Sequence, residues 1–344
     1  MNAQHPLLIE ELQNIARLPY DWEPLRGKTV AVTGAGGLVG NYLTRALDCA
    51  SRVHDLRLNL IALCRNPERA RTQLTGLEGV QYRVYDAAKP VDPDFRADYI
   101  VHAAGNAHPM AFASDPVGTL WGNVYGTHEL LENVRVNGGR LLLISTGEIY
   151  GESPEISAFD ETGFGAVNPM TARACYPESK RAAEALCAAY AAQYKTDALA
   201  ARLTYVYGPT ITDTNSRADA QFLRKALAGE NIVMKSAGTQ VRSWCYAADA
   251  AAALILLLLK GEAGQAYNVA GRTGVADIRT YAETLAQLAG VRVIFDLPPE
   301  SESRGYSKVT RAVLDPSKLE ALGFRARYDL REGLEHTLKI AGQS

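Results

Sequence analysis

Short apolar runs alternate along the chain with longer segments whose apolar residues recur at helical spacing. The runs are rich in Val, Ile, Leu and Thr and carry few charged residues. Continuous apolar strands separated by helices are typical of a parallel sheet that is covered by helices on both faces. The predicted strands are residues 29–33, 58–63, 81–85, 99–102, 141–145 and 199–203, and the helices between them include 39–50, 120–136 and 179–194.

The two ends of the chain depart from this alternation. Residues 1–27 contain apolar residues at helical spacing, which predicts a helix packed on the main body. Beyond the sixth strand the pattern loosens into a loop-rich stretch, and helices follow near 218–229 and 276–289. The apolar helix 247–260 and the strand 266–270 are expected to return to the main sheet. The sequence therefore predicts a large α/β domain and a smaller, discontinuous C-terminal domain.

Composition and charge exclude several classes of protein. The 344 residues include 36 Lys and Arg against 38 Asp and Glu, a net charge of −2, whereas nucleic-acid-binding domains usually carry a marked basic excess. The longest apolar run, Ala250–Leu259, is shorter than the roughly 20 residues that span a membrane. The N-terminus lacks the basic segment and apolar core of a secretion signal. We expect a soluble cytoplasmic protein that binds neither nucleic acid nor a membrane.

The cysteines and histidines give no sign of a metal centre. Five cysteines are scattered along the chain without CxxC spacing. His, Cys, Asp and Glu residues do not cluster at the spacing of a metal site. The sequence therefore predicts no disulfide framework and no metal.

A glycine-rich turn follows the first predicted strand. The strand Thr29–Thr33 runs into Gly-Ala-Gly-Gly-Leu-Val-Gly, and a helix is predicted directly after it. Glycines at this spacing permit a tight turn, a close approach of the backbone to a pyrophosphate, and close packing of helix on strand. The residues expected to bind a dinucleotide are Gly34, Gly36, Gly37, Leu38, Val39 and Gly40.

This turn makes the expected fold class more specific. We predict an α/β protein with a Rossmann-type doubly wound parallel sheet and a smaller, discontinuous C-terminal substrate domain. The predicted parts are an N-terminal helical extension (1–27), an NAD(P)-binding domain (28–204, with 244–272 returning to it) and a substrate-binding domain (205–243 and 273–344).

The segment Leu63–Asn66, at the end of the second predicted strand, bears on the choice of cofactor. NAD-selecting sites usually carry an acidic residue there, which bonds the ribose hydroxyl, whereas this chain has Arg65. A guanidinium suits a 2′-phosphate, so NADP is slightly favoured over NAD as a tightly bound, recycled cofactor. The alternative is that Arg65 stacks on adenine in an NAD enzyme. Asp86, after the third strand, is a candidate to bond adenine or only to cap a turn.

A tyrosine and a lysine four residues apart form the second chemical signal. Tyr176 and Lys180 are expected on one helix face, within reach of a common ligand. An unperturbed tyrosine has a pKa near ~10, but a nearby ammonium and an oxidised nicotinamide favour the phenolate, so the pair makes a usable proton acceptor. Upstream, the strand 141–145 ends at Thr146, whose hydroxyl is expected at the edge where doubly wound sheets bind ligands.

Further stretches accompany these two signals: His102–Ala104, Asn123–Thr127, Ser145–Gly151, Arg202–Pro209, Gln240–Asp249 and Leu322–Phe324. With them, the chain resembles the extended short-chain dehydrogenase/reductase superfamily, and within it the NAD-dependent epimerase/dehydratase family of nucleotide-sugar enzymes. The resemblance covers about residues 28–335. It implies that Tyr176 is the base, that Lys180 holds the ribose and tunes Tyr176, and that Thr146 bonds the sugar O4.

The resemblance also implies binding residues outside this group. Arg242 is expected to bind the diphosphate of the substrate. The other positions expected beside the cofactor are Ala103, Ala104 and Asn123, and those expected beside the substrate are His108, Tyr205, Arg217 and Arg311.

Within that family the chain is most similar to the UDP-glucuronate decarboxylases, because Thr-x-Glu stands at 146–148 and Arg-Ala-Cys-Tyr at 173–176. The implied reaction moves a hydride from sugar C4 to the cofactor, and the resulting 4-keto acid loses CO2. A 4,6-dehydratase with Glu148 as base is an alternative, although Gly147 stands where many of these enzymes place an acid. A 4-epimerase or reductase, in which Glu148 is structural, and a non-catalytic NAD(P)-binding sensor are further alternatives.

Two residues depart from the decarboxylase pattern. Tyr205 stands where the family often has an Asn that contacts the nucleotide phosphates, and Thr210 stands where decarboxylases tend to have Arg. The base and the sugar of the substrate therefore stay open. The helices 120–136 and 176–194 resemble those that build a four-helix dimer interface in this family, so a homodimer is expected.

Overall fold

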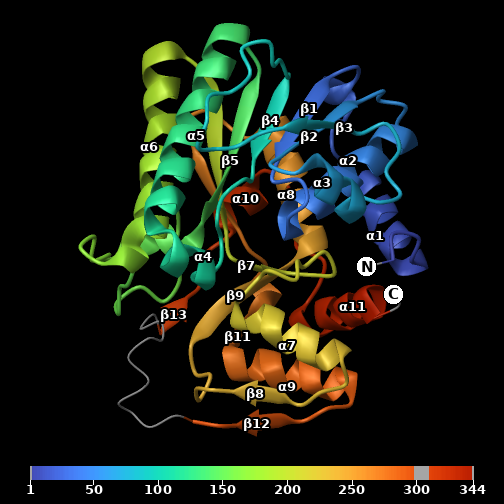
Figure 1. The fold of residues 1–344 in the computed structure, drawn as a ribbon, viewed down its shortest axis with the longest axis vertical. Helices are drawn as coiled ribbons and strands as arrows, with labels where there is room; N and C mark the ends of the chain where they lie inside the picture. The colour runs from blue at the N-terminus through green and yellow to red at the C-terminus, as the bar shows by residue number, and fades with distance from the viewer. Residues whose placement is uncertain (1, 298–309, 343–344) are drawn as a thin grey trace.

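A seven-stranded parallel sheet forms the larger lobe of the molecule (Figure 1). The structure is a computed structural model that describes residues 2–297 and 310–342. The strand order is β10-β6-β5-β4-β1-β2-β3, which is doubly wound and confirms the expected fold class. The order reverses between β1 and β4, the point at which such sheets bind ligands. The strands are β1 (Thr29–Thr33), β2 (Asn59–Cys64), β3 (Gln81–Val84), β4 (Tyr99–His102), β5 (Arg140–Thr146), β6 (Asp197–Leu203) and β10 (Ala266–Val269).

Both faces of this sheet are buried, which explains the continuous apolar runs. In β1, Val30 and Val32 belong to one hydrophobic core and Ala31 belongs to the other, because successive side chains point to opposite faces. The helices on the face of Val30 are α1 (Pro6–Ala16), α2 (Leu38–Val53) and α8 (Ala247–Lys260), and those on the face of Ala31 are α5 (Pro116–Asn137) and α6 (Cys175–Tyr194).

The smaller lobe is built around one central strand, as the lower part of Figure 1 shows. Strand β9 (Val241–Tyr246) pairs with β7 (Tyr205–Tyr207), β11 (Val275–Asp277) and β13 (Arg311–Ala312). The remaining elements of this lobe are β8 (Ile232–Met234), β12 (Val293–Phe295), α7 (Ala218–Leu227), α9 (Ile278–Ala289) and α11 (Leu330–Gly342). Helix α10 (Ser317–Ala321) instead lies against β10 of the large sheet, where Lys318 donates to the Ala266 carbonyl. Strand β9 is followed directly by α8, so the chain passes from the smaller lobe into the larger one at this point.

Short elements line the edge at which the strands of the large sheet end. They are α3 (Pro67–Gln73), α4 (Pro109–Ser114) and the 3-10 turns η2 (Gly147–Tyr150) and η3 (Ala172–Ala174); η1 (Glu23–Leu25) and η4 (Arg272–Gly274) lie elsewhere. Turn η2 continues directly from β5, and η3 leads directly into α6. These two turns therefore bring residues from two different elements to the same end of the sheet.

Helix ends were the least accurate part of the sequence prediction. The helix expected to begin at residue 120 begins at Pro116, because the Asp115 side chain caps it: its Oδ1 accepts from the Gly118 amide at 2.8 Å. Proline at the first position supports this start, since its ring fixes a helical φ. The helix expected from residue 179 begins at Cys175, so Tyr176 lies in its first turn.

Candidate functional site

The glycine turn connects β1 to α2, and two of its glycines leave no room for a side chain. Gly34 has φ +66°, and a Cβ there would lie 2.8 Å from the Ala103 carbonyl oxygen. A Cβ on Gly40 would collide with the Gly34 carbonyl. Gly37 caps α2 without a side-chain hydrogen bond, so the first amides of this helix face outward at its positive end. This backbone cradle suits an anionic group such as a pyrophosphate.

Buried polar atoms without a protein partner lie beside this cradle. His102 Nδ1 contacts Thr33 Oγ1 at 3.0 Å, but its Nε2 has no hydrogen-bond partner among the described residues, and neither has Asn123 Oδ1. Burial, with the charge of Lys180 as a second cause, lowers the pKa of His102 to about 3, so this imidazole is neutral. A Cβ on Gly105 would lie 2.7 Å from Asn123 Oδ1. These orphaned groups and the cradle fit a polar ligand of dinucleotide type.

The two residues expected near adenine have different settings. Arg65 is exposed directly after β2, at the end of the strand where the sequence predicted it. The Asp86 carboxylate accepts from the Ala88 amide at 3.1 Å, so it caps the turn after β3. Of the two roles expected for Asp86, the structure shows the hydrogen bond that caps a turn.

Tyr176, Lys180 and Thr146 come together where β5 meets α6. Thr146 is the last residue of β5, and the Lys180 ammonium donates to the Ile144 carbonyl of the same strand at 2.9 Å. The Tyr176 side chain is only 7% exposed. Burial raises its pKa above the ordinary value and the charge of Glu148 adds to this, whereas a hydrogen bond with Thr146 acts in the opposite direction. The phenol and the hydroxyl therefore face the same point.

The charge of Lys180 is held by a carboxylate one turn further along α6. Burial lowers the pKa of Lys180 to about 8, and Glu184 counteracts this shift. Glu184 also accepts from Ser145, the neighbour of Thr146, and pairs with Arg202 at 2.8 Å. Sequence reasoning missed Glu184, although its position four residues after Lys180 on a helix was a signal that could have found it.

Three arginines lie close to this end of the sheet, and the charges of all three act on the phenol of Tyr205. Arg173 and Arg217 both favour the phenolate of Tyr176, and so they lower its pKa. The Arg242 guanidinium lies over the Tyr205 ring, with Cζ 5.2 Å from the ring centre. These three cations make the site suitable for an anionic substrate, because the guanidinium fork matches phosphate and carboxylate oxygens.

Arg173 was not among the predicted site residues, and its contacts could not be read from the sequence. It lies in η3 and donates to Glu148 Oε2 at 2.5 Å. Its guanidinium also lies over the Phe112 ring at 4.8 Å, and that ring stacks on Tyr176 with 4.6 Å between centres. Glu148, the candidate base, is thus engaged in an ion pair beside Tyr176.

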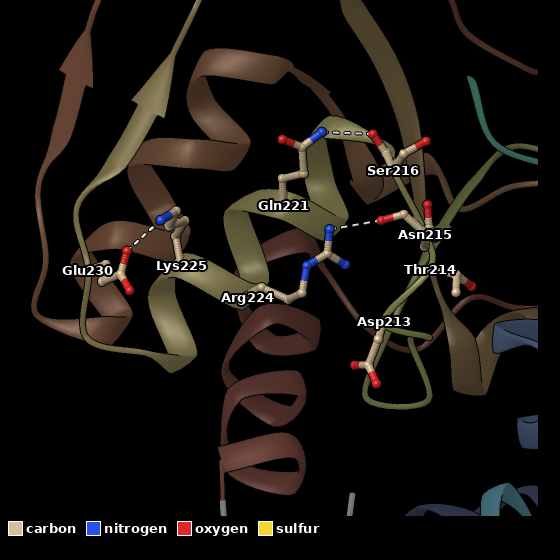
Figure 2. Close-up of a pocket in the computed structure, with 8 residues that line it drawn as sticks. All are labelled: Asp213, Thr214, Asn215, Ser216, Gln221, Arg224, Lys225 and Glu230. Atoms are coloured by element: carbon tan, nitrogen blue, oxygen red, sulfur yellow. Dashed lines mark hydrogen bonds and ion pairs between the residues drawn. The ribbon is translucent and has the colours of Figure 1, made fainter. Parts of the chain in front are cut away.

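His108 faces the loop that leads into α7. Its Nδ1 contacts Ser216 Oγ at 3.1 Å, and Arg217 follows with its guanidinium on the Val206 carbonyl and on Asp219. A cavity of about 430 Å³ adjoins this loop, as Figure 2 shows. Its lining consists of Asp213, Thr214, Asn215, Ser216, Gln221, Arg224, Lys225 and Glu230.

Arg311, which was also predicted to bind the substrate, makes its described contacts away from Tyr176. It lies in β13 and its Nε donates to the Ser157 carbonyl at 2.5 Å. The structure thus uses Arg311 to tie the loop after η2 to the smaller lobe, and it shows no described contact between Arg311 and the group around Tyr176.

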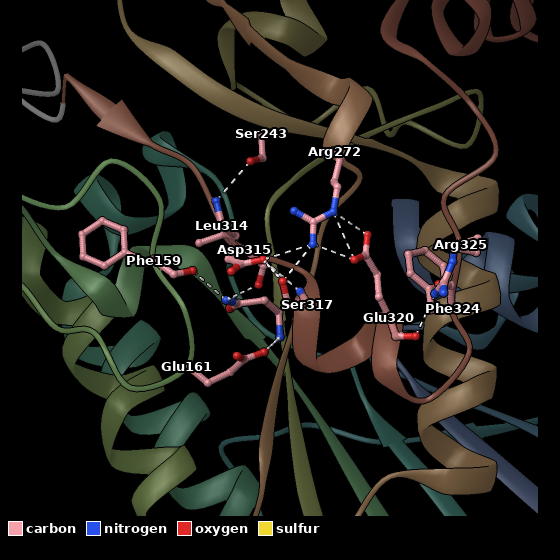
Figure 3. A network of polar contacts seen from close by, with 11 residues as sticks. Phe159, Glu161, Ser243, Arg272, Leu314, Asp315, Ser317, Glu320, Phe324 and Arg325 are labelled. Atoms are coloured by element: carbon pink, nitrogen blue, oxygen red, sulfur yellow. Dashed lines mark hydrogen bonds and ion pairs between the residues drawn. The ribbon is translucent and has the colours of Figure 1, made fainter.

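A polar network fixes the turn that carries Glu148. The fully buried Asn268 donates to the carbonyls of Phe159 and Asp315, and Tyr150, the last residue of η2, donates to Asn268 Oδ1 at 2.6 Å. Figure 3 shows how this network joins the Phe159 loop to the segment that follows β13. The contacts cross the boundary between the lobes, so the position of η2 depends on both.

Two further features of the structure concern membrane-spanning helices and metal-binding clusters. Among the helices that the structure describes, none is both long enough and apolar enough to cross a membrane. The same residues contain no group of three or more His, Cys, Asp and Glu side chains placed to hold a metal ion.

The fold and the site together define a dinucleotide-binding protein of Rossmann type with a tyrosine, a lysine and a threonine at the carboxyl end of the sheet. The family model described as the NAD dependent epimerase/dehydratase family matches residues 30–270. The chain belongs to this family. The match confirms the family expected from the sequence, and with it the enzyme class and the NAD-dependent cofactor chemistry.

The curated relatives include several decarboxylases. The chain is similar to UDP-glucuronic acid decarboxylase 3 of Arabidopsis thaliana, with 29% identity over 339 residues, which cover 94% of each chain. It is also similar to UDP-glucuronic acid decarboxylase 5 of the same plant, with 34% identity over 241 residues that cover 69% of this chain and 68% of the relative. The expected likeness to decarboxylases is thereby confirmed.

Solved structures agree on the fold. The UDP-glucose 4-epimerase of Thermus thermophilus, in complex with NAD, has a TM-score of 0.76 at 26% identity, covering 92% of this chain and 99% of that one. Epimerase Mth375 of Methanothermobacter thermautotrophicus has a TM-score of 0.78 at 19% identity, covering 98% and 95%. The latter likeness concerns the fold alone.

Proposed function

We propose that this protein oxidises C4 of a nucleotide-linked uronic acid with a bound nicotinamide cofactor and then releases CO2, as a UDP-glucuronate decarboxylase does. The observation that carries the proposal is the Tyr176 phenol, which is buried, hydrogen-bonded with Thr146 and located on the same helix as Lys180. The decarboxylases among the relatives, one of which matches 94% of the chain, support the same reaction.

The glycine turn and its neighbours would hold the cofactor. Residues 34–40 would supply the cradle for the pyrophosphate; Ala103 and Ala104 directly follow β4, and Asn123 lies buried within α5. Lys180, whose ammonium lies 3.8 Å from the position that a Cβ on Gly105 would take, would bind the ribose. When bound, the nicotinamide accepts the hydride from the sugar.

Tyr176 would take the proton of the C4 hydroxyl. Thr146 is placed to orient that hydroxyl, because its own hydroxyl already hydrogen-bonds with the phenol. The charges of Arg217 and Arg173 favour the phenolate and so oppose the effect of burial on the pKa of Tyr176. These neighbours therefore increase the fraction of Tyr176 present as phenolate, the form that can accept the proton, relative to a buried tyrosine without them.

The setting of Glu148 favours decarboxylation over dehydration. A 4,6-dehydratase needs a carboxylate that is available to remove the C5 proton, and here Arg173 holds the carboxylate of Glu148 at 2.5 Å. A 4-keto uronate needs no such base, because a β-keto acid loses CO2 by itself and the electron pair moves onto the C4 carbonyl. The enolate that remains is then protonated at C5, and the ketone is reduced by the return of the hydride.

Product masses test this proposal. Purified protein is incubated with UDP-glucuronate, UDP-glucose and other nucleotide sugars, and the products are analysed by mass spectrometry. Loss of the mass of CO2 from the uronate is expected. Loss of water would instead indicate a dehydratase, and an isomer of unchanged mass would indicate a 4-epimerase; either result alone would overturn decarboxylation.

We further propose that Arg65 lets the site accept NADP. The supporting observation is that an exposed guanidinium follows β2, where an acidic residue usually selects NAD. Replacement of Arg65 by alanine should weaken NADP binding about 10- to 100-fold, as expected for a lost charged hydrogen bond, and leave NAD binding nearly unchanged. Equal affinities of the wild type and of Arg65→Ala for NADP would show that Arg65 has no such role.

The assembly that we propose is a homodimer formed through α5 and α6. Three apolar side chains near the start of α5 are strongly exposed: Val117 at 79%, Leu120 at 43% and Trp121 at 51%. Exposed alanines on α6 would let a second pair of helices approach closely. Light scattering should give a dimer mass for the wild type and a monomer mass for Trp121→Glu; a monomeric wild type would refute this part.

A further inference from the structure

The side chain of Arg173 stands beside the reacting phenol with donors to spare. Its side chain is 51% exposed, and Glu148, its ion-pair partner, is 31% exposed. Among the described residues, Glu148 is the hydrogen-bond acceptor of this guanidinium, which has five N–H donors in a planar fork. A second acceptor therefore has access to Arg173 from the open side of the site.

The orientation of this guanidinium is fixed by its neighbours. It lies over the Phe112 ring, and Phe112, Cys175 and Tyr176 form a small buried cluster. Because Phe112 stacks on Tyr176 with an angle of 20° between the rings, a ligand on Arg173 is held at a set position relative to the phenol. Few entropic losses remain when a ligand binds to a fork that is already oriented.

We propose that Arg173 recognises the carboxylate of the sugar ring, and that it shares its fork between this carboxylate and Glu148. This proposal rests on the proposed function and names the residue that selects a uronate over a neutral sugar. Carboxylates are planar acceptors that match the guanidinium fork, whereas the hydroxymethyl group of a neutral hexose leaves the cation without a charged partner.

The two other arginines of the site suit a different group. Arg217 already donates to the Val206 carbonyl and pairs with Asp219 at 3.3 Å, and Arg242 lies over the Tyr205 ring. Arg173 differs from both because its side chain is half-exposed and its hydrogen bond to Glu148 leaves further N–H donors of the fork for a second carboxylate. Arg173 is therefore the cation best suited to bind the sugar carboxylate close to the reacting C4.

The test compares two ligands that differ in one group. Calorimetry gives Kd of UDP-glucuronate and UDP-glucose for the cofactor-loaded wild type, Arg173→Gln and Arg173→Lys. Arg173→Gln should weaken uronate binding about 10- to 100-fold and leave UDP-glucose within about 2-fold. Arg173→Lys should recover part of the preference, since it keeps the charge without the fork. Arg57→Gln, at an arginine that is 79% exposed beside Asp55, is the matched control.

Replacement of the competing carboxylate supplies a second, opposite readout. Glu148→Gln frees the Arg173 fork from its charged partner, so the affinity for UDP-glucuronate should rise while that for UDP-glucose stays constant. Equal losses for both ligands in Arg173→Gln would mean a structural role, and an unchanged preference for the uronate would overturn the inference.

The inference and the proposed reaction fail in different ways. A wild-type protein that prefers the uronate, loses the preference in Arg173→Gln and releases no CO2 would keep the recognition and refute decarboxylation. A wild-type protein that releases CO2, with the same ratio of KM values for the variant and the wild type, would keep the reaction and refute the role of Arg173.

Discussion

The carboxylate of Glu11 lies 2.6 Å from Nδ1 of His336, although the two residues belong to the first and the last helix. Glu11 is only 1% exposed, and it also accepts from the hydroxyls of Tyr42 and Tyr246. One buried carboxylate thus joins the N-terminal extension to α2, to β9 and to α11. Such a group is costly to bury unless it is fully hydrogen-bonded, and here the three partners supply those bonds.

Glu11→Gln should therefore destabilise the fold. The amide keeps the shape of the side chain but replaces a charged acceptor by a neutral one and adds a donor without a place for it. We expect a loss of about 1–3 kcal/mol in the free energy of unfolding, measured by urea denaturation. Glu10→Gln, at the exposed neighbouring position, is the control and should change little. Equal stability of the two variants would show that the buried contacts do not hold the extension.

Asp249 should make stability depend on pH. Burial raises its pKa from 3.8 to about 7, although backbone hydrogen bonds from Arg327 and Tyr328 act in the opposite direction. Because the folded state keeps the proton more tightly than the unfolded state, the contribution of Asp249 is fully present below about pH 4 and is lost as the pH rises through about 7.

Asp249→Asn removes this titration. The unfolding free energy of the wild type minus that of the variant should fall steadily from about pH 4 to about pH 8, because only the wild type loses the contribution of Asp249. Urea denaturation across this range measures both free energies. Parallel curves for the two proteins would show that this carboxyl does not titrate differently in the folded state.

Tyr176→Phe should abolish most of the activity and keep the fold. Phenylalanine preserves the stacked contact with Phe112, so the buried cluster stays filled. Without the hydroxyl the proton of the substrate has no acceptor, and a drop in kcat of about 100- to 10,000-fold is expected. Thermal denaturation and the affinity for the cofactor should match the wild type. Turnover close to the wild-type rate would assign the base elsewhere.

Glu184→Gln should shift the pH profile of the reaction. Burial already lowers the pKa of Lys180 to about 8, and of the two groups that partly restore it, Glu184 has a larger effect than Cys187. Without this carboxylate the ammonium loses its proton at lower pH, so the alkaline limb of kcat/KM should move toward neutrality. The position of the limb is the readout, because the loss of the ion pair with Arg202 also lowers stability. Glu335→Gln, on the exposed face of α11, is the control and should leave the limb in place.

The sequence by itself determined the elements of the large sheet and the two motifs that define its chemistry. Apolar runs without alternation required strands buried on both faces, as Val30 and Ala31 show by facing different cores. The spacing of the glycines predicted the turn after β1. The structure gives the reason for one of them, because a side chain at Gly34 would meet the Ala103 carbonyl. The four-residue spacing of Tyr176 and Lys180 placed both on one helix, because residues at that spacing are neighbours on its surface.

Only the tertiary structure decided which groups face these motifs. Arg173 meets Glu148 and Phe112 because η3, η2 and α4 converge at the end of the sheet, and nothing in the local sequence of any one of them indicates the other two. Glu184 meets Ser145 and Arg202 for the same reason. A pattern of apolar positions states which face of an element is buried, whereas the partner across that face, and hence the charge and the pKa of a buried group, depends on how the elements pack.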